Sequence, residues 1–482
     1  MAKAAPLGWP DPPAHLHFLG ICGYAVSGLA LCSQELGYLV TGADEDAYPP
    51  TTDTLVAAGI EFSRHHDAAN LERWGVPQLV VLGNQVQAGN PELEAARALG
   101  LSLLSEAEAY RGLTQGRLRA VVCGTHGKTG TAALTAFMLD RAGCRPGFRL
   151  GATARDFPTT ARLGDPRARG PFVFEGDEYK TSVLDPSAKF LHWQPEVVTL
   201  LNLELDHPDL YPDLDAYAQP YRELLGGLGV GDQLIYPAGD RLAMELAREV
   251  GAAERQTFGL AEGDWHLAQP PARRAGRLQL LAQGPTGPPV ELLLPTFGAH
   301  QAANGLAALA TAVRLGASVE AAAAASADYR GVARRFEVLD QVDGVTVVDD
   351  YAHHPTKIRA TVAGAREQFG DQVQLIMVHV PHTYSRTKAL LLDYRGAFDG
   401  LDLLVLGPIE PARERHLAGT VSSDDVAALV TGTELVQVGS AEEAIAAVRA
   451  RLKPPTVVVC SSVRGFGDVA ARLLAALRDG SG

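Results

Sequence analysis

Apolar and polar positions alternate in blocks along the 482 residues of the chain. Short apolar runs end repeatedly in glycine or in polar side chains, and a helix-like segment follows most of them. Such runs are typical of strands buried in a parallel sheet, and their alternation with helices predicts an α/β fold. The clearest runs are residues 118–123, 172–174, 197–201, 345–348, 375–378, 403–406 and 457–459.

The chain is too long for a single hydrophobic core, and its length predicts three domains. We expect a Rossmann-like N-terminal domain over residues 1–113, a central P-loop ATPase-like domain over residues 114–329, and a Rossmann-like C-terminal domain over residues 330–482. Residues 270–289 are rich in proline, glycine and arginine, and we expect them to form a loop-bearing stretch. A turn at Asp343–Gly344 predicts a strand pair near the start of the third domain.

The most informative stretch reads Gly-Thr-His-Gly-Lys-Thr-Gly and joins the run at 118–123 to a helix-like segment. Its spacing resembles G-x-x-x-x-G-K-[ST], with Val122 in place of the first glycine. Glycines let backbone amides close around phosphate oxygens at a helix N-terminus, Lys128 adds a cation, and the Thr129 hydroxyl can bind Mg²⁺. The alternative is a glycine-rich turn with an exposed lysine. The residues expected to contact a nucleotide are Gly124, Thr125, His126, Gly127, Lys128, Thr129 and Gly130.

Acidic loops follow the next two apolar runs. The first reads Glu175-Gly-Asp-Glu178, and the second reads Asn202-Leu-Glu-Leu-Asp-His207. The carboxyl ends of parallel strands form the crevice in which doubly wound sheets bind ligands. Oxygen-rich loops at that edge favour Mg²⁺, whereas the alternative for each loop is a solvated acidic end.

The first segment of the chain resembles the opening of a Rossmann-like unit. Gly20 and Gly23 lie between a short strand and a helix, and Asp44 follows the second strand, about where a ribose hydroxyl is bound. Cys22 stands where G-x-G-x-x-G requires its second glycine, so a dinucleotide site is disfavoured. We therefore expect these residues to bind a single nucleotide diphosphate, with an ordinary β–α turn as the alternative.

Polar residues gather at two strand ends of the third domain. Residues 349–356 read Asp-Asp-Tyr-Ala-His-His-Pro-Thr, and residues 379–388 read His-Val-Pro-His-Thr-Tyr-Ser-Arg-Thr-Lys. Two acids, a tyrosine and two histidines would be costly as pure structure, so the first segment predicts a ligand or catalytic role. In the central domain, His300 and Asn304 are four residues apart in a helix-like segment and share one face.

The net charge of −14 argues against a partner held by overall positive charge, such as nucleic acid or an anionic membrane. No uninterrupted apolar run of about twenty residues is present, so we expect no membrane span. The five cysteines are scattered without a C-x-x-C pair, which favours a reducing cytoplasm and predicts no zinc site. We expect a cytoplasmic protein that is a monomer or a dimer.

Five motifs in this order resemble the Mur ligase family over nearly the whole chain. Mur ligases are three-domain enzymes that use ATP to form an amide on a UDP-N-acetylmuramate carboxylate. The resemblance implies a UDP-sugar-binding first domain, an ATP-binding central domain and a C-terminal ligase domain. It also implies ATP and Mg²⁺ as cofactors, and UDP-N-acetylmuramate with an amino acid or short peptide as partners. The motifs begin at Gly124, Glu175, Asn202, Gly298 and Asp349.

Carried over by position, the resemblance implies roles for individual residues. The implied Mg²⁺ ligands are Thr129, Glu175 and His207. The residues implied near the adenine, ribose and phosphates are His300, Asn304, Arg335 and Asp350. The residues implied for the substrate carboxylate or the amine are His353, Tyr384 and Arg386. The residues implied to act in catalysis are Lys128, His207, Arg335, His353 and Arg386.

Two branches of the family remain open. Gly20-Ile-Cys-Gly23 and Ser187-Ala-Lys-Phe190 resemble the branch that attaches L-alanyl-γ-D-glutamyl-diaminopimelate in peptidoglycan recycling, which is the branch we expect. The segment 381–386 instead resembles the branch that adds L-alanine. A catalytically degenerate nucleotide-binding homologue and an NAD-dependent oxidoreductase are alternatives from other classes. Gly130 departs from the usual Thr or Ser, which lowers helix propensity by up to about 1 kcal/mol.

Overall fold

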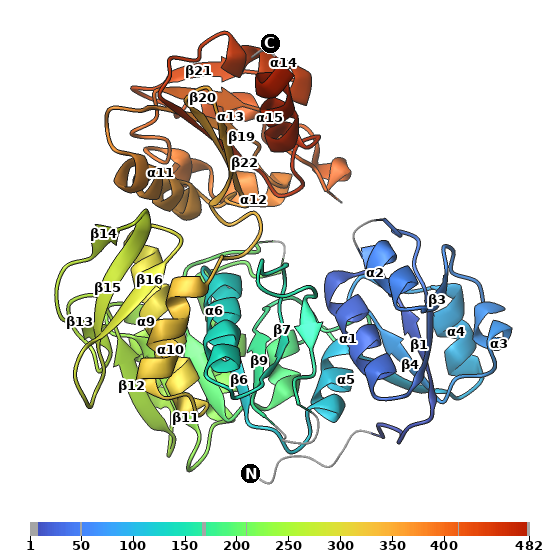
Figure 1. The fold of residues 1–482 in the computed structure, drawn as a ribbon. Helices are drawn as coiled ribbons and strands as arrows, with labels where there is room; N and C mark the ends of the chain where they lie inside the picture. Colours follow the sequence, from blue (N-terminus) through green and yellow to red (C-terminus); the bar gives the residue numbers. More distant parts are fainter. Residues whose placement is uncertain (1–7, 49–50, 166–169, 209, 413, 480–482) are drawn as a thin grey trace.

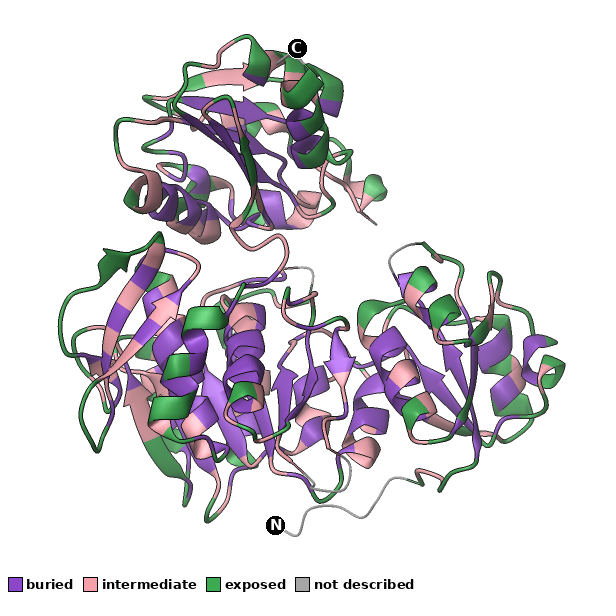
Figure 2. Ribbon diagram, viewed as in Figure 1, coloured by how far each residue is buried: buried purple, intermediate pink, exposed green. Residues whose placement is uncertain are grey.

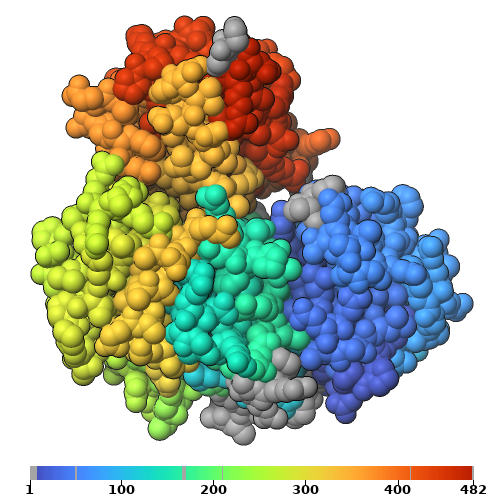
Figure 3. Space-filling view, in the orientation of Figure 1, coloured from blue at the N-terminus to red at the C-terminus, as the bar shows by residue number. Residues whose placement is uncertain are grey.

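The computed structural model describes residues 8–48, 51–165, 170–208, 210–412 and 414–479. The chain forms three α/β bodies, and the central one contacts both of the others (Figure 1). The N-terminal body is blue in Figure 1, the central body runs from cyan to yellow, and the C-terminal body is orange to red. In the space-filling view the surface is notched between the N-terminal and C-terminal bodies (Figure 3).

The N-terminal body contains a five-stranded parallel sheet in the order β3-β2-β1-β4-β5. Its strands are β1 (His15–Leu19), β2 (Leu39–Ala43), β3 (Glu61–Ser63), β4 (Leu79–Leu82) and β5 (Ser102–Ser105). Its helices are α1 (Tyr24–Glu35), α2 (Thr51–Ala57), α3 (Asn70–Arg73), α4 (Pro91–Ala98) and α5 (Glu106–Leu113). This order places the loop after β1 next to the point where the strand order reverses, which is where such sheets bind ligands.

A buried carboxylate joins three parts of the N-terminal body. Glu92, in the first turn of α4, is fully buried and lies 3.3 Å from a ring nitrogen of His17 and 3.3 Å from one of His66. The side-chain amide of Asn70 also donates a hydrogen bond to it. Burial raises the pKa of Glu92, but these hydrogen bonds outweigh burial and bring the pKa to about 2. The carboxylate therefore stays charged inside the body at neutral pH.

The central body is built on a seven-stranded, mostly parallel sheet in the order β12-β11-β10-β6-β9-β7-β8. Its strands are β6 (Arg119–Cys123), β7 (Gly147–Arg149), β8 (Ala161–Arg162), β9 (Phe172–Glu175), β10 (Val197–Leu200), β11 (Gln233–Pro237) and β12 (Glu254–Phe258). Its helices are α6 (Lys128–Arg141), α7 (Leu214–Gly226), α8 (Arg241–Glu249), α9 (Ala299–Arg314) and α10 (Val319–Ala325). The central strands are buried and the outward helix faces are exposed (Figure 2).

The expectation of a loop-bearing stretch over residues 270–289 is wrong for much of that segment. It contains two strands of a small antiparallel sheet, in which β15 pairs with three neighbours. Leu278, Leu280 and Ala282 alternate with more exposed residues and fill the core between this sheet and α9. The proline and glycine residues that suggested a loop lie mainly at the turns. The strands are β13 (His266–Leu267), β14 (Ala272–Arg274), β15 (Arg277–Gln283) and β16 (Val290–Leu294).

The C-terminal body contains a six-stranded sheet in the order β17-β18-β22-β19-β20-β21. The predicted strand pair around Asp343–Gly344 is confirmed, since β17 and β18 pair antiparallel across that turn. The other neighbours are parallel. The strands are β17 (Glu337–Val342), β18 (Val345–Asp350), β19 (Gln374–His379), β20 (Leu403–Leu406), β21 (Glu434–Gln437) and β22 (Thr456–Ser461). The helices are α11 (Pro355–Phe369), α12 (Tyr384–Ala389), α13 (Ser423–Ala427), α14 (Ala441–Arg449) and α15 (Val469–Asp479).

The N-terminal and central bodies share one hydrophobic core. The ring of Tyr110 in α5 lies 6.2 Å from that of Phe172 and 5.9 Å from that of Phe174 in β9. Gly28 of α1 lies so close to Ala161 of β8 that an added Cβ would approach the alanine Cβ to 2.6 Å. The buried apolar clusters of the C-terminal body, by contrast, include only residues 345–474 among those described. The contacts that join this body to the central one through the candidate site are polar.

Candidate functional site

The loop between β6 and α6 is the centre of the candidate site. Gly124 and Gly127 adopt positive φ values of 126° and 85°, which favour glycine. A Cβ on Gly127 would lie 2.6 Å from the Oδ1 atom of Asn304, so the close approach of α9 also requires glycine here. Asn202 holds the loop from the other side, because its Oδ1 accepts the His126 backbone N–H at 2.9 Å. The loop is therefore fixed with the N-terminus of α6 behind it, as a phosphate-binding loop requires.

Lys128 is held inside the loop by an acidic partner. Its Nζ donates to Glu178 at 2.8 and 3.0 Å and to the Gly124 carbonyl at 2.7 Å. Burial lowers the pKa of Lys128, but the nearby carboxylates of Glu178 and Asp177 outweigh burial and raise it. The exposed-lysine alternative is thus wrong for this structure, since only 14% of the side chain is accessible.

The predicted Mg²⁺ ligands contact two different carboxylates. The Thr129 hydroxyl donates to Glu175 at 2.8 Å, and the second Glu175 oxygen accepts the Gly151 N–H at 2.6 Å. His207 instead lies with its Nε2 3.4 Å from Glu178. A hydroxyl beside a carboxylate at a phosphate loop fits Mg²⁺, which takes few protein oxygens and completes its shell with phosphate and water.

The loop after β10 connects the central body to the C-terminal body. Asp206 is buried and accepts a hydrogen bond from Arg386 Nε at 2.8 Å. The same guanidinium lies 2.9 Å from Nδ1 of His207 and 3.1 Å from Nδ1 of His382. Burial raises the pKa of Asp206, but His207 and Arg386 outweigh burial and hold it well below its usual range. Arg386 therefore spans the junction of two bodies and orients an imidazole that also faces the phosphate loop.

Arg335 and His353 also face this junction. Arg335 lies 3.4 Å from the Thr129 hydroxyl, and its guanidinium stacks 4.6 Å from the ring centroid of Tyr351. His353 is buried, and its Nδ1 lies 2.9 Å from the Tyr351 carbonyl. Burial, together with the charges of Lys357 and Arg386, holds the pKa of His353 well below its usual range. The imidazole is therefore neutral at physiological pH.

Three predicted residues lie less directly at the junction. Asp350 is buried and accepts hydrogen bonds from Thr361 Oγ1 at 2.5 Å and from the Phe336 N–H at 3.3 Å, so it supports the local fold of the C-terminal body. Tyr384 is half-buried at the start of α12. His300 is exposed in the first turn of α9, one turn before Asn304.

At Gly130 an added Cβ would meet nothing within 4 Å, so the site tolerates the Thr or Ser that this position usually carries.

The N-terminal residues predicted for substrate binding form a closed turn. Gly20 has a φ of 75°, and Gly23 lies at the N-cap of α1. The Asp44 carboxylate accepts the N–H of Cys22 at 2.8 Å and that of Asp46 at 2.9 Å. Asp44 therefore shapes the turn at the N-terminus of α1.

Three residues near the loop were not singled out from the sequence. Glu178 and Asp206 belong to the quoted motifs but had no assigned role. Lys357, in the first turn of α11, is half-buried. Burial lowers its pKa to about 8, which the Asp206 carboxylate partly opposes. The acidic pair could have been found from its place at two strand ends, whereas nothing in the sequence indicates that Lys357 faces the central body.

Comparisons with known proteins agree with this architecture. The chain matches the models described as Mur ligase family, catalytic domain, over residues 15–117, Mur ligase middle domain over residues 122–312, and Mur ligase, glutamate ligase domain, over residues 334–464. Among the described residues, no helix has the length and apolar character needed to cross a membrane.

Relatives of two kinds are similar to the chain. The UDP-N-acetylmuramate–L-alanine ligase of Roseiflexus sp. (strain RS-1) is 35% identical over 94% of this chain and 96% of its own. The UDP-N-acetylmuramate–L-alanyl-γ-D-glutamyl-meso-2,6-diaminoheptandioate ligase of Escherichia coli (strain K12) is 34% identical over 78% of this chain and 81% of its own.

Solved structures share the fold. A UDP-N-acetylmuramate–alanine ligase from Thermotoga maritima has a TM-score of 0.77 at 23% identity, covering 97% of this chain and all of its own. A murein peptide ligase from Psychrobacter arcticus has a TM-score of 0.72 at 27% identity, covering 96% and 98%. The predicted three-domain α/β architecture is confirmed. The chain belongs to the Mur ligase family, whose members are ATP-dependent ligases that form amide bonds.

Proposed function

We propose that the protein activates the carboxylate of UDP-N-acetylmuramate with ATP and joins it to the amine of L-alanyl-γ-D-glutamyl-diaminopimelate. One observation carries the ATP part of this proposal. A half-buried lysine, paired with a buried glutamate, lies in a glycine loop beside a threonine–carboxylate pair. In this arrangement the muramate carboxylate attacks the γ-phosphate, and the amine then displaces phosphate from the acyl phosphate. Such chemistry depends on positioning and on neutralising charge.

The residues of the loop have separable roles in this proposal. Lys128 leaves Glu178 to neutralise phosphate oxygens, and the backbone amides at the N-terminus of α6 bind them. Thr129 and Glu175 would hold Mg²⁺, which when bound neutralises phosphate charge. Arg335 approaches from the C-terminal body and adds a second cation at the same hydroxyl.

The amine side of the proposal rests on the C-terminal body. His353, buried in that body, is our candidate for positioning the substrate carboxylate or the incoming amine. Arg386 holds His207 against Glu178 and so connects the amine side to the phosphate side. Because the groups come from two bodies, the site is complete only when these bodies are together.

The choice of the tripeptide as acceptor is supported by the motifs at 20–23 and 187–190. L-alanine is the second candidate. It is favoured by the segment 381–386 and by the Roseiflexus relative named as an L-alanine ligase, which aligns with 94% of this chain. The expected localisation in the cytoplasm, the absence of nucleic-acid partners and the monomeric or dimeric state remain predictions, as do the domain boundaries at residues 113 and 329.

The test is phosphate release from ATP with UDP-N-acetylmuramate present, comparing L-alanine with the tripeptide as acceptor. We expect release that depends on the tripeptide, with mass spectrometry showing the amide product. Release with L-alanine alone would overturn the acceptor and support the second candidate. No release with either would contradict the ligase proposal and support a nucleotide-binding homologue.

A further inference from the structure

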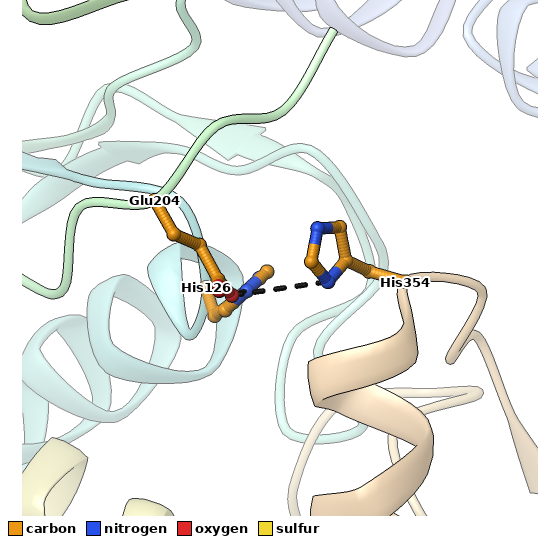
Figure 4. A group of neighbouring side chains, drawn as sticks. All are labelled: His126, Glu204 and His354. Carbon is orange, nitrogen blue, oxygen red and sulfur yellow. Dashed lines mark hydrogen bonds and ion pairs between the residues drawn. The ribbon is translucent and has the colours of Figure 1, made fainter. Parts of the chain in front are cut away.

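A second cluster of metal-ligating side chains lies at the junction, apart from Thr129 and Glu175. It consists of His126 in the phosphate loop, Glu204 in the loop after β10, and His354 at the N-cap of α11. Their ligand atoms all lie within 4.8 Å of one another. Figure 4 shows His354 reaching from the C-terminal body toward the other two side chains, which come from the central body.

The two imidazoles have buried nitrogen atoms without hydrogen-bond partners. Nε2 of His126 contacts Glu204, while Nδ1 of His126 has no partner. Nδ1 of His354 lies 3.8 Å from Glu204 and accepts the Thr356 N–H at 3.2 Å, while its Nε2 has no partner. These unpartnered nitrogens are not the ones that face Glu204, which are Nε2 of His126 and Nδ1 of His354. A cation would bind at the two facing nitrogens, and Nδ1 of His354 would exchange the Thr356 N–H for it.

The surroundings hold the three side chains in place. Thr356 donates its hydroxyl to one oxygen of Glu204 at 3.0 Å, which leaves the other oxygen facing the two rings. The rings of His126 and His354 lie 4.9 Å apart. Carboxylate ligands in metal sites are oriented by such outer hydrogen bonds. Burial lowers the pKa of both imidazoles, that of His354 to about 4, so both are neutral at physiological pH.

We propose that His126, Glu204 and His354 bind a borderline transition-metal cation of the Zn²⁺ class, which bridges the central and C-terminal bodies. Two imidazoles and one carboxylate form a donor set that suits Zn²⁺ or Co²⁺, whereas Mg²⁺ prefers oxygen ligands. The cysteine pattern predicted no zinc site, but a zinc-class cation can be bound by histidine and carboxylate ligands alone. Three protein ligands leave a fourth position for water or a substrate oxygen.

In this proposal the enzyme binds a second cation besides Mg²⁺, and this second cation acts on the arrangement of the two bodies. A cation held by ligands from two bodies binds tightly only when those bodies are together, so it favours the closed arrangement. His126 is also part of the phosphate loop, so such a cation would restrain the loop beside the nucleotide. Zn²⁺ would then alter domain closure and not only the chemistry.

The experiment uses the full-length protein stripped of metal by a chelator and titrated with Co²⁺ in excess Mg²⁺. We expect one Co²⁺ per chain, a visible absorption band, and displacement by Zn²⁺. Glu204→Gln and His354→Gln, made separately, should each weaken binding at least tenfold. Two controls should bind Co²⁺ like the parent. Glu175→Gln removes a proposed Mg²⁺ ligand, and His65→Gln removes an exposed histidine of the N-terminal body.

Three results would overturn the proposal. The first is that the parent protein does not bind Co²⁺ stoichiometrically. The second is that both ligand variants have normal circular dichroism spectra and bind Co²⁺ like the parent. The third is that Glu175→Gln loses Co²⁺ binding. If the ligand variants do not fold, X-ray absorption at the zinc edge of the parent decides. Two imidazole ligands support the site, and an all-oxygen shell contradicts it.

Discussion

Replacing Arg386 by methionine tests what holds the C-terminal body in place. The change keeps an unbranched, apolar stem and removes the guanidinium group with its charge. It leaves Asp206, of which 2% of the side chain is accessible, without its arginine partner. It also removes the contact to Nδ1 of His207. We expect the C-terminal body to separate from the central one, because opening allows water to solvate the carboxylate.

The size of the effect follows from burial. Removing one member of a buried ion pair costs about 3–5 kcal/mol when the other charge stays buried. Asp206 keeps the hydrogen bond from the His207 N–H at 2.8 Å, and opening lets it recover hydration, so the lower value applies. About 3 kcal/mol corresponds to roughly a hundredfold change in the closure equilibrium. We expect kcat/KM to fall by a similar factor while the protein remains folded.

Small-angle X-ray scattering of the substrate-free protein measures closure directly, and phosphate release measures turnover. Arg366→Met is the matched control, because the Arg366–Asp402 pair lies within the C-terminal body and is partly exposed. It should change neither closure nor kcat/KM by more than about twofold. Asp206→Asn combined with Arg386→Met should lose little more than either single change, since the two residues act as a pair. If Arg386→Met scatters like the parent, the bridge does not hold the bodies together.

Three further predictions concern single carboxylates and the loop lysine. Lys128→Ala should abolish ATP-dependent product formation. Its affinity for the UDP-sugar, measured by calorimetry, should stay within a few-fold of that of the parent protein. Unchanged turnover would refute the loop assignment. Glu175→Gln should raise the Mg²⁺ concentration needed for half-maximal rate, because Thr129 then lacks its carboxylate partner, and an unaltered Mg²⁺ curve would exclude it as a ligand. Folding lowers the pKa of Glu92 from 4.5 to about 2, so its charge stabilises the fold above about pH 4.5, and this contribution is lost as pH falls toward 2. At pH 7 it amounts to roughly 3 kcal/mol. Urea unfolding should therefore show Glu92→Gln to be less stable than the parent at pH 7, with a difference that shrinks toward pH 3, and a constant difference would contradict the assignment.

The parts of the site that could be predicted from sequence depend on local spacing. The phosphate loop and the acids after β9 and β10 follow directly from apolar runs and the residues that end them. The structure places Lys128, Thr129 and Glu175 together, as expected from strand ends that share one edge of a sheet. No local pattern, however, shows that Glu178 pairs with Lys128.

Contacts between distant segments could not be predicted. Asp206 and Arg386 are 180 positions apart, and each is an ordinary polar residue of a loop or short helix when viewed alone. The strand β15 was missed for another reason. In this strand the buried residues Leu278, Leu280 and Ala282 alternate with more exposed ones, and proline and glycine flank the segment. The prediction used the composition of a longer window, which does not reveal a pattern that repeats every two residues.

The shared core of the first two bodies has a consequence for how the chain acquires its structure. Tyr110, Phe172 and Phe174 complete each other's packing, so residues 8–48, 51–165 and the central strands should form one cooperative folding unit. The C-terminal body has its own apolar clusters and should form a second unit. During synthesis the first unit can complete its packing before the second emerges from the ribosome. A protease cut between residues 329 and 334 should then release two folded fragments rather than an unfolded chain.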